Sequence, residues 1–219
     1  MADVIIFGIG QIAEIAYFYL TNDSEHKVVA FSVDKEFLTQ DKFQDLPVVP
    51  YEELTEKYPP NKYQMFIPIS YKKVNTLRAK KFYDAKQKGY TCISYISSKA
   101  IYYNTSVGEN CFIFENNVIQ PFSKIGDNCI LWSGNHIGHH TIIENHCFLA
   151  SQVVISGKVT IGEYSFLGVN STIADNLKIG KSNIIGSGAI IFKDTEDNSV
   201  YSPKETEKSK VSSNRLRSF

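Results

Sequence analysis

The 219-residue sequence has no net charge, a single tryptophan, two methionines and no long apolar run. Its 23 lysine and arginine residues equal its 23 aspartate and glutamate residues, so no global field attracts nucleic acid or an anionic membrane surface. The start MADVIIFGIG lacks the basic segment of a signal peptide, and no apolar stretch reaches the length of about 18 residues that a membrane span needs. These absences predict a cytoplasmic protein with no nucleic-acid partner and no membrane insertion.

Cysteine is scarce as well, and its spacing excludes common metal motifs. Cys92, Cys111, Cys129 and Cys147 form no CxxC pair, which predicts reduced thiols and no cysteine zinc site. The composition is 43% hydrophobic and 21% charged, which is typical of a globular protein that buries a core.

What the sequence does contain is an aliphatic residue at every sixth position over its second half. A period of six fits neither a helix nor a plain strand, and it is typical of the hexapeptide β-helix, in which a short strand and a corner repeat. The sixteen positions are Ile101, Val107, Ile113, Ile119, Ile125, Leu131, Ile137, Ile143, Leu149, Ile155, Ile161, Leu167, Ile173, Ile179, Ile185 and Ile191.

A second period, of eighteen residues, indicates three hexads in each coil. The sixteen hexads therefore predict about five coils and a prism about 25 Å tall. We expect the cysteines in this period to stack inside the prism, and the glycines to supply a backbone conformation with positive φ. The members of the period are Gly108, Gly126, Gly162 and Gly180, with Glu144 as the exception, and Cys111, Cys129 and Cys147.

Residues 4–34 predict a strand, a glycine turn, a helix and a second strand. Gly8, Gly10 and Ala13 fit GxGxxA, a variant of the dinucleotide fingerprint in which glycines let a phosphate approach a helix N-terminus. Asp34 follows the second strand, where a ribose-binding acid would lie. The alternative stays open that the glycines only pack a strand against a helix and that Asp34 is a solvated loop residue.

A third apolar run, residues 64–70, leads through Ser70, Tyr71 and Lys72 into a basic helix. These three residues join Gly8, Gly10 and Asp34 as candidate substrate ligands, whereas the basic helix is expected to be a solvated face. Residues 91–97 predict a fourth strand.

Four segments of the repeat have a recognisable order: WSGNHIGHHTI at 132–142, VVISGKVTIG at 153–162, FLGVNSTI at 166–173 and IIGSGAII at 184–191. Together with GIGQIAEIA near the start, they resemble the sugar acyltransferases of the sialic acid O-acetyltransferase type. They are most similar to the bacterial N-acetyltransferases for nucleotide-linked 4-amino-4,6-dideoxy sugars, of the viosamine acetyltransferase type. The resemblance implies a left-handed parallel β-helix, a homotrimer, and acetyl-CoA bound between neighbouring prisms without a metal.

The resemblance also implies roles for single residues. His139 takes the register of the family's catalytic base. The family usually has Asp or Glu next, where this sequence has His140, which leaves His140 as an orienting group or a competing base. The amide of Gly157 is implied as a donor to the thioester. The backbone groups that would line the coenzyme groove are those of Ser187, Gly188 and Ala189.

The histidines suit acyl transfer to an amine, which needs a base and donors for the developing oxyanion. A neutral imidazole supplies the base near pH 7. Alternation along the chain predicts that His139 and His140 point in opposite directions. A metal site or a polar seam between subunits is the alternative interpretation of the cluster, which comprises His136, His139, His140 and His146.

The sequence therefore predicts three parts: a Rossmann-like α/β domain for a nucleotide sugar (1–98), a left-handed β-helix acetyltransferase domain (99–200) and a polar tail (201–219). The predicted function is transfer of acetyl from acetyl-CoA to the 4-amino group of a dTDP-linked 4-amino-4,6-dideoxy sugar for a surface glycan such as O-antigen. The alternatives are a sugar O-acetyltransferase of the sialic acid type, a non-catalytic nucleotide-binding repeat scaffold and, third, a nicotinamide oxidoreductase.

Overall fold

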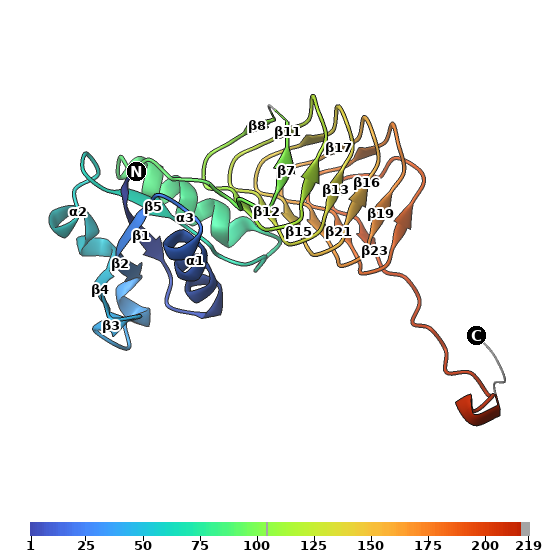
Figure 1. The fold of residues 1–219 in the computed structure, drawn as a ribbon, viewed down its shortest axis with the longest axis horizontal. Helices are drawn as coiled ribbons and strands as arrows, with labels where there is room; N and C mark the ends of the chain where they lie inside the picture. Colours follow the sequence, from blue (N-terminus) through green and yellow to red (C-terminus); the bar gives the residue numbers. More distant parts are fainter. Residues whose placement is uncertain (104, 216–219) are drawn as a thin grey trace.

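The computed structural model describes residues 1–103 and 105–215, in which an α/β domain adjoins a triangular β-prism (Figure 1). The α/β domain lies at one end of the prism, and the chain after the last strand extends away from the other end (Figure 1). Residue 104 and residues 216–219, which include Arg217 of the predicted tail, lie outside the described residues. Within the described part, no helix combines the length and apolar character needed to cross a membrane.

The N-terminal domain is a five-stranded sheet with the order β3–β4–β2–β1–β5. All neighbouring strands are parallel except the β3–β4 pair, so the predicted βαβ unit is confirmed. Its elements are β1 (Asp3–Phe7), α1 (Gln11–Asn22), β2 (Lys27–Val33), η1 (Lys35–Phe37), β3 (Lys42–Phe43), β4 (Leu46–Pro50), η2 (Tyr51–Glu53), α2 (Leu54–Lys57), β5 (Gln64–Phe66) and α3 (Thr76–Gln87).

The run at 91–97 does not form the fourth strand of this sheet. Only a single bridge joins Cys92 to Met65, and β6 (Tyr95–Ile96) pairs instead with the prism. The sequence analysis did not identify two strands of the domain, β3 and β4, and β4 contains both Pro47 and Pro50. Val48 and Val49 of β4 are buried beside β2, which explains why this short apolar segment is extended.

Three parallel sheets form the prism. The domain face, against which the α/β domain packs, contains β6, β9 (Phe112–Ile113), β12 (Ile130–Leu131), β15 (Phe148–Leu149), β18 (Phe166–Leu167), β21 (Ile184–Ile185) and β23 (Val200–Tyr201). The apolar face contains β7 (Ile101–Tyr102), β10 (Val118–Ile119), β13 (His136–Ile137), β16 (Val154–Ile155), β19 (Thr172–Ile173) and β22 (Ile190–Ile191). The third face contains β8 (Ser106–Val107), β11 (Lys124–Ile125), β14 (Ile142–Ile143), β17 (Thr160–Ile161) and β20 (Lys178–Ile179).

The predicted period is confirmed in the core of the prism. Strands pair with those eighteen residues on, as His136 with Val154 and Ile137 with Ile155, and the aliphatic positions from Ile113 to Ile191 form one buried cluster. Ile101 is the exception. It pairs with Val118 rather than Ile119 and is 49% exposed, because the first coil is one residue shorter.

The conformation at the corners corrects one expectation. Positive φ recurs every sixth residue, as at Asn110 (54°) and Asn128 (59°), and not at the glycines of the eighteen-residue period. Glycine is required at those positions for another reason, which is the close contact between coils. A Cβ on Gly108 would lie 2.7 Å from the carbonyl carbon of Gly126 in the next coil, so only glycine permits the coils to stack this closely.

The three periodic cysteines stack inside the prism, as predicted. Cys111, Cys129 and Cys147 are fully buried in the aliphatic core, and burial raises the pKa of Cys111 and Cys129 well above the usual thiol value. They pack as small apolar side chains.

The prism and the α/β domain are joined through Arg78 of α3, a helix that was expected to be solvated. Arg78 is fully buried, and its guanidinium donates 3.0–3.3 Å hydrogen bonds without a carboxylate partner. The expectation of a solvated helix is therefore wrong for its inward side. The acceptors are the carbonyls of Ile69, Ser70, Asn128, His146 and Cys147 and the side-chain oxygen of Asn75.

Candidate active site

His139 lies on the corner that links β13 of the apolar face to β14 of the third face, which we call the base corner. Its backbone N–H donates to Gln120 Oε1 at 2.9 Å, and its carbonyl accepts from Lys158 of the next coil at 2.8 Å. The side chain is exposed. The neighbouring coils thus fix the backbone and leave the imidazole accessible.

Gly157 lies one coil beyond His139 on the same corner. A Cβ at Gly157 would be 2.7 Å from both Cε1 and Nε2 of His139, so the imidazole rests against the glycine backbone. The structure therefore brings together these two predicted residues. Any larger side chain at 157 would displace the ring.

His140 contacts His139 directly, contrary to expectation. Their Nδ1 atoms are 3.1 Å apart, and the rings meet edge to face at 89°. The prediction of opposite directions is wrong because His140, at φ 59°, is a left-handed corner residue to which strand alternation does not apply. One imidazole must donate to the other, since two bare nitrogens would repel.

The remaining two histidines of the predicted cluster lie elsewhere. His136 is on the apolar face, in register with Val118 and Val154. His146 is buried at another corner, where Nδ1 contacts Asn128 and Nε2 contacts Tyr83, each at 2.9 Å. Burial, and then the charge of Arg78, lowers the pKa of His146 to about 4. Across residues 1–103 and 105–215, no three His, Cys, Asp or Glu side chains converge as metal ligands.

A cavity of about 420 Å³ opens in the α/β domain beside the carboxyl ends of β1 and β2. The first turn of α1 adjoins it, where free N–H groups favour phosphate. The walls are largely apolar, with Phe37 and Leu77 among them. Of the six predicted substrate ligands, the cavity contains five: Gly8, Gly10, Asp34, Ser70 and Lys72.

Lys81 of α3 is a cavity residue that the sequence analysis missed. Its Nζ donates to Asp34 Oδ1 at 2.5 Å and lies about 5 Å above the rings of Phe7 and Tyr51. The spacing of Arg78, Lys81 and Phe82 on one helix side was the available signal. Asp34 is therefore not a free solvated acid; it is held by a cation inside the cavity.

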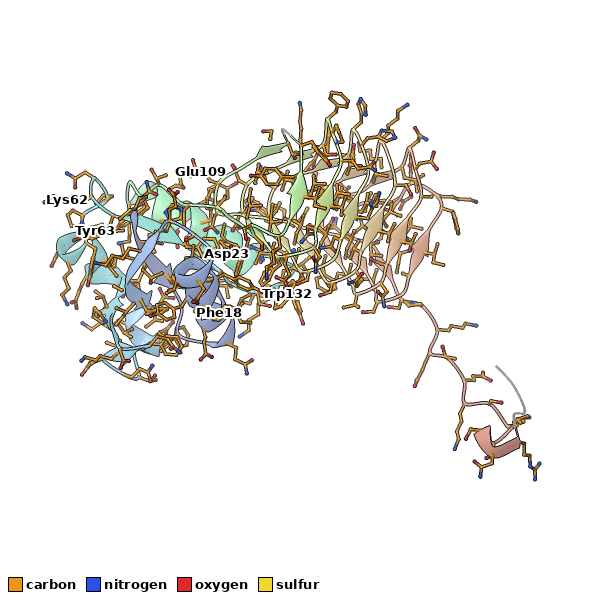
Figure 2. The ribbon with its side chains drawn as sticks, in the orientation of Figure 1. Phe18, Asp23, Lys62, Tyr63, Glu109 and Trp132 are labelled. Carbon is orange, nitrogen blue, oxygen red and sulfur yellow. The ribbon has the colours of Figure 1, made fainter. Side chains whose placement is uncertain are left out.

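Tyr71, the sixth predicted ligand, lines a second cavity of about 320 Å³. Its ring lies 5.0 Å from Phe148 and 4.8 Å from Phe166. Trp132 forms another wall and lies at the junction of the two domains (Figure 2). Ser70 lines both cavities, so the two adjoin.

The predicted coenzyme residues lie on the corner between the domain face and the apolar face, which we call the cavity corner. Ser187 lines the aromatic cavity. Gly188, at φ 73°, donates its N–H to Val169. Ala189 is buried, and its N–H and carbonyl are used by Gly186 and Thr172 within the prism. The structure does not bring these residues to His139, because the apolar face separates the two corners.

Comparisons with known proteins agree with this architecture. The family model described as bacterial transferase hexapeptide (six repeats) matches residues 104–139 and 123–157. No curated protein matches the chain by sequence.

Solved structures match over nearly the whole chain. A mutant of perosamine N-acetyltransferase from Caulobacter crescentus, in complex with CoA and GDP-perosamine, is 24% identical with a TM-score of 0.82, covering 91% of this chain and 93% of that one. The acetyltransferase domain of PglB from Neisseria gonorrhoeae is 18% identical with a TM-score of 0.78, covering 91% and 96%. WeeI from Acinetobacter baumannii is 17% identical with a TM-score of 0.71, covering 91% and 96%. The predicted fold, a Rossmann-like domain followed by a left-handed β-helix, is confirmed.

Proposed function

We propose that this protein is an acetyl-CoA-dependent N-acetyltransferase that acetylates the amino group of a nucleotide-linked amino sugar. The observation that carries the proposal is the exposed imidazole of His139, seated against Gly157 on a corner of the β-helix. The similar perosamine N-acetyltransferase binds CoA and GDP-perosamine, which supports both proposed substrates.

His139 acts as the general base in this proposal. As the amine nitrogen attacks the thioester carbonyl of acetyl-CoA, Nε2 of His139 takes the proton that the nitrogen loses. When the C–S bond breaks, Nε2 gives a proton to the departing sulfur, so coenzyme A leaves as the thiol. By the register of the resembling family, the N–H of Gly157 would donate to the developing oxyanion. The coenzyme would lie along the prism, with Ser187 and Gly188 near it. Ala189 would donate no hydrogen bond to the coenzyme, because its N–H already donates to Gly186 within the prism.

The α/β domain would bind the nucleotide. The turn of Gly8 and Gly10 suits the diphosphate, and the Asp34–Lys81 pair offers both an acceptor and a donor to the nucleoside. The adjoining aromatic cavity, walled by Tyr71 and Trp132, suits a deoxygenated sugar ring. We place dTDP-linked 4-amino-4,6-dideoxy sugars for a surface glycan first, by motif resemblance, and GDP-linked sugars second.

A homotrimer would complete the site. The base corner and the cavity corner lie on opposite edges of the apolar face, where Val154 and Ile190 are 40% and 59% exposed. If three copies pack this face around a three-fold axis, the base corner of one copy meets the cavity corner of the next, because a cyclic interface joins unlike edges. Each site would then take His139 from one chain and the nucleotide from its neighbour.

The central experiment measures acetylation of a panel of nucleotide-linked amino and hydroxy sugars. We expect N-acetylated product, and we expect His139→Ala to lower kcat by about 10² to 10⁴ while nucleotide-sugar affinity stays within a few-fold. Product formed only on hydroxyl groups would replace the proposal with sugar O-acetylation. Absence of coenzyme A binding in calorimetry would favour a non-catalytic scaffold.

A complementation experiment tests the shared site. His139→Ala removes the base, and Gly10→Asp places a carboxylate in the cavity that would bind the diphosphate. The two impaired variants are co-expressed in equal amounts and assayed at a nucleotide-sugar concentration too low for the Gly10→Asp cavity to bind. They should recover about a quarter of wild-type activity, since three-quarters of random trimers are mixed and each has one intact site of three. No recovery in mixed trimers would mean that base and cavity act within one chain.

A further inference from the structure

The contact between His139 and His140 assigns a role to His140 that rests on the proposed function. We propose that His140 is the positioning residue of the base and the outlet for its proton. Its Nδ1 accepts the Nδ1–H of His139 over the 3.1 Å contact. This fixes the tautomer of His139 in which Nε2 is bare and can accept a proton.

The surroundings of the His139 ring support a hydrogen bond donated by His139 to His140. Cε1 and Nε2 of His139 face Gly157, whereas Nδ1 faces His140, so the two ring nitrogens have separate tasks. If His140 donated instead, the proton of His139 would sit on Nε2, the atom that must accept from the amine. The proposed direction is therefore the one compatible with a base at this corner.

The proton taken from the substrate can leave along the same contact. Nε2 of His139 gains the amine proton, the Nδ1 proton of His139 passes to Nδ1 of His140, and His140 loses its own Nε2 proton to water. Each imidazole is then neutral, with its proton on the other ring nitrogen. The reverse shift takes up a proton from water at Nε2 of His140, returns the Nδ1 proton to His139 and gives the Nε2 proton of His139 to the departing thiolate. Coenzyme A therefore leaves as the thiol, and both starting tautomers are restored. His140 is exposed, which gives its Nε2 access to solvent.

The surroundings of His140 favour its transient cationic form on one side. The ring of Phe122, one coil before it, lies 4.8 Å away at a tilt of 38°, a geometry in which an aromatic face attracts a cation. The charged residues elsewhere on the corner are Lys158, one coil beyond His140, and Asp175, Lys193 and Asp194 farther along. A carboxylate at position 140 would hold the proton on His139 by its negative charge. The neutral imidazole of His140 can instead accept that proton and release another to water.

The first test does not depend on activity. Nitrogen-15 NMR of protein labelled at histidine reports which ring nitrogen carries the proton. We expect the Nδ1–H tautomer for His139 at neutral pH, and we expect that signal to revert to the ordinary Nε2–H form in His140→Leu. A wild-type His139 protonated at Nε2 would overturn the proposal, even if the enzyme acetylates amino sugars.

The second test uses paired variants and pH profiles. His140→Leu keeps bulk but removes the acceptor and should lower kcat about tenfold with KM for both substrates unchanged, whereas His140→Glu should restore most of the loss. The low-pH limb of kcat/KM should shift in His140→Glu, because a carboxylate stabilises the cationic form of His139. Equal kcat and equal pH profiles in wild type and His140→Leu would refute the role of His140, while loss of all acetylation with every sugar would refute the proposed function instead.

Discussion

The prism and the α/β domain position their residues by different means. Beyond the first coil of the prism, each residue lies above the one eighteen positions earlier, so the numbering alone places Gly157 beside His139. In the α/β domain, the cavity depends on segments with no shared period, as where Asp34 of the β2 end meets Lys81 of α3. A repeat therefore reveals its contacts in the sequence, whereas a layered domain reveals mainly its elements.

The largest expected effect on stability comes from the hydrogen bonds of Arg78 that connect the α/β domain to the prism, which we call the joint. Arg78→Met removes the buried guanidinium and leaves several carbonyls of both regions without donors. We expect the free energy of unfolding to fall by about 3 to 5 kcal/mol, with the α/β domain becoming protease-sensitive first. Chemical denaturation followed by limited proteolysis measures both.

Lys80→Met is the matched control for Arg78→Met. It makes the same kind of change two residues away on α3, where the side chain is exposed. Its effect should stay within about 0.5 kcal/mol. Similar losses in the two variants would mean that the helix as a whole, and not the buried network, joins the regions.

The joint also marks the limit of prediction from sequence. The periods of six and eighteen predicted the prism core and the cysteine stack, because both depend only on register. The pair of His139 and Gly157 came from the family resemblance. Five of the six predicted substrate ligands line one cavity, because carboxyl ends of parallel strands share an edge. Arg78 and Lys81 escaped prediction because the lysine-rich helix was interpreted as a solvated face, although both residues share a helix side with the buried Phe82. The His139–His140 contact escaped because alternation was applied to a left-handed corner.

His146, in the same joint, provides a pH-dependent test of intermediate size. Its folded pKa of about 4 lies below the ordinary 6.5, so the unfolded chain binds more protons between these values. The contribution of the neutral His146 to the free energy of unfolding is therefore fully present above about pH 6.5. It is lost as the pH falls towards 4, which lowers the free energy of unfolding by about 2 to 3 kcal/mol.

The comparison with His146→Gln isolates this contribution. Glutamine does not titrate, so the difference in unfolding free energy between wild type and variant should shrink as the pH falls from 7 to 4. Denaturant melts at several pH values measure it. A difference that is constant over this range would show that His146 does not titrate with the joint.

The smallest expected effects on stability come from substitutions at Gly8 and Gly10, the two glycines of the turn between β1 and α1, and they differ between the two positions. Gly8 has a φ of +113°, which other residues avoid, so Gly8→Ala should cost about 1 to 2 kcal/mol. Gly10 has an ordinary φ of −99° and open space where a Cβ would lie, and it precedes α1 as its N-cap. Aspartate is a favoured N-cap, so Gly10→Asp should leave the stability unchanged or slightly higher.

The same substitution should nevertheless weaken nucleotide-sugar binding by more than about tenfold, because the carboxylate would enter the space proposed for the diphosphate. Gly10→Ser, an N-cap of similar size without charge, should weaken it less, and affinity for acetyl-CoA should stay constant in both variants. Calorimetry with each substrate tests this against thermal melts of the same samples. If Gly10→Asp binds the nucleotide sugar as tightly as wild type, the glycine turn only packs β1 against α1, and the nucleotide must bind elsewhere in the molecule.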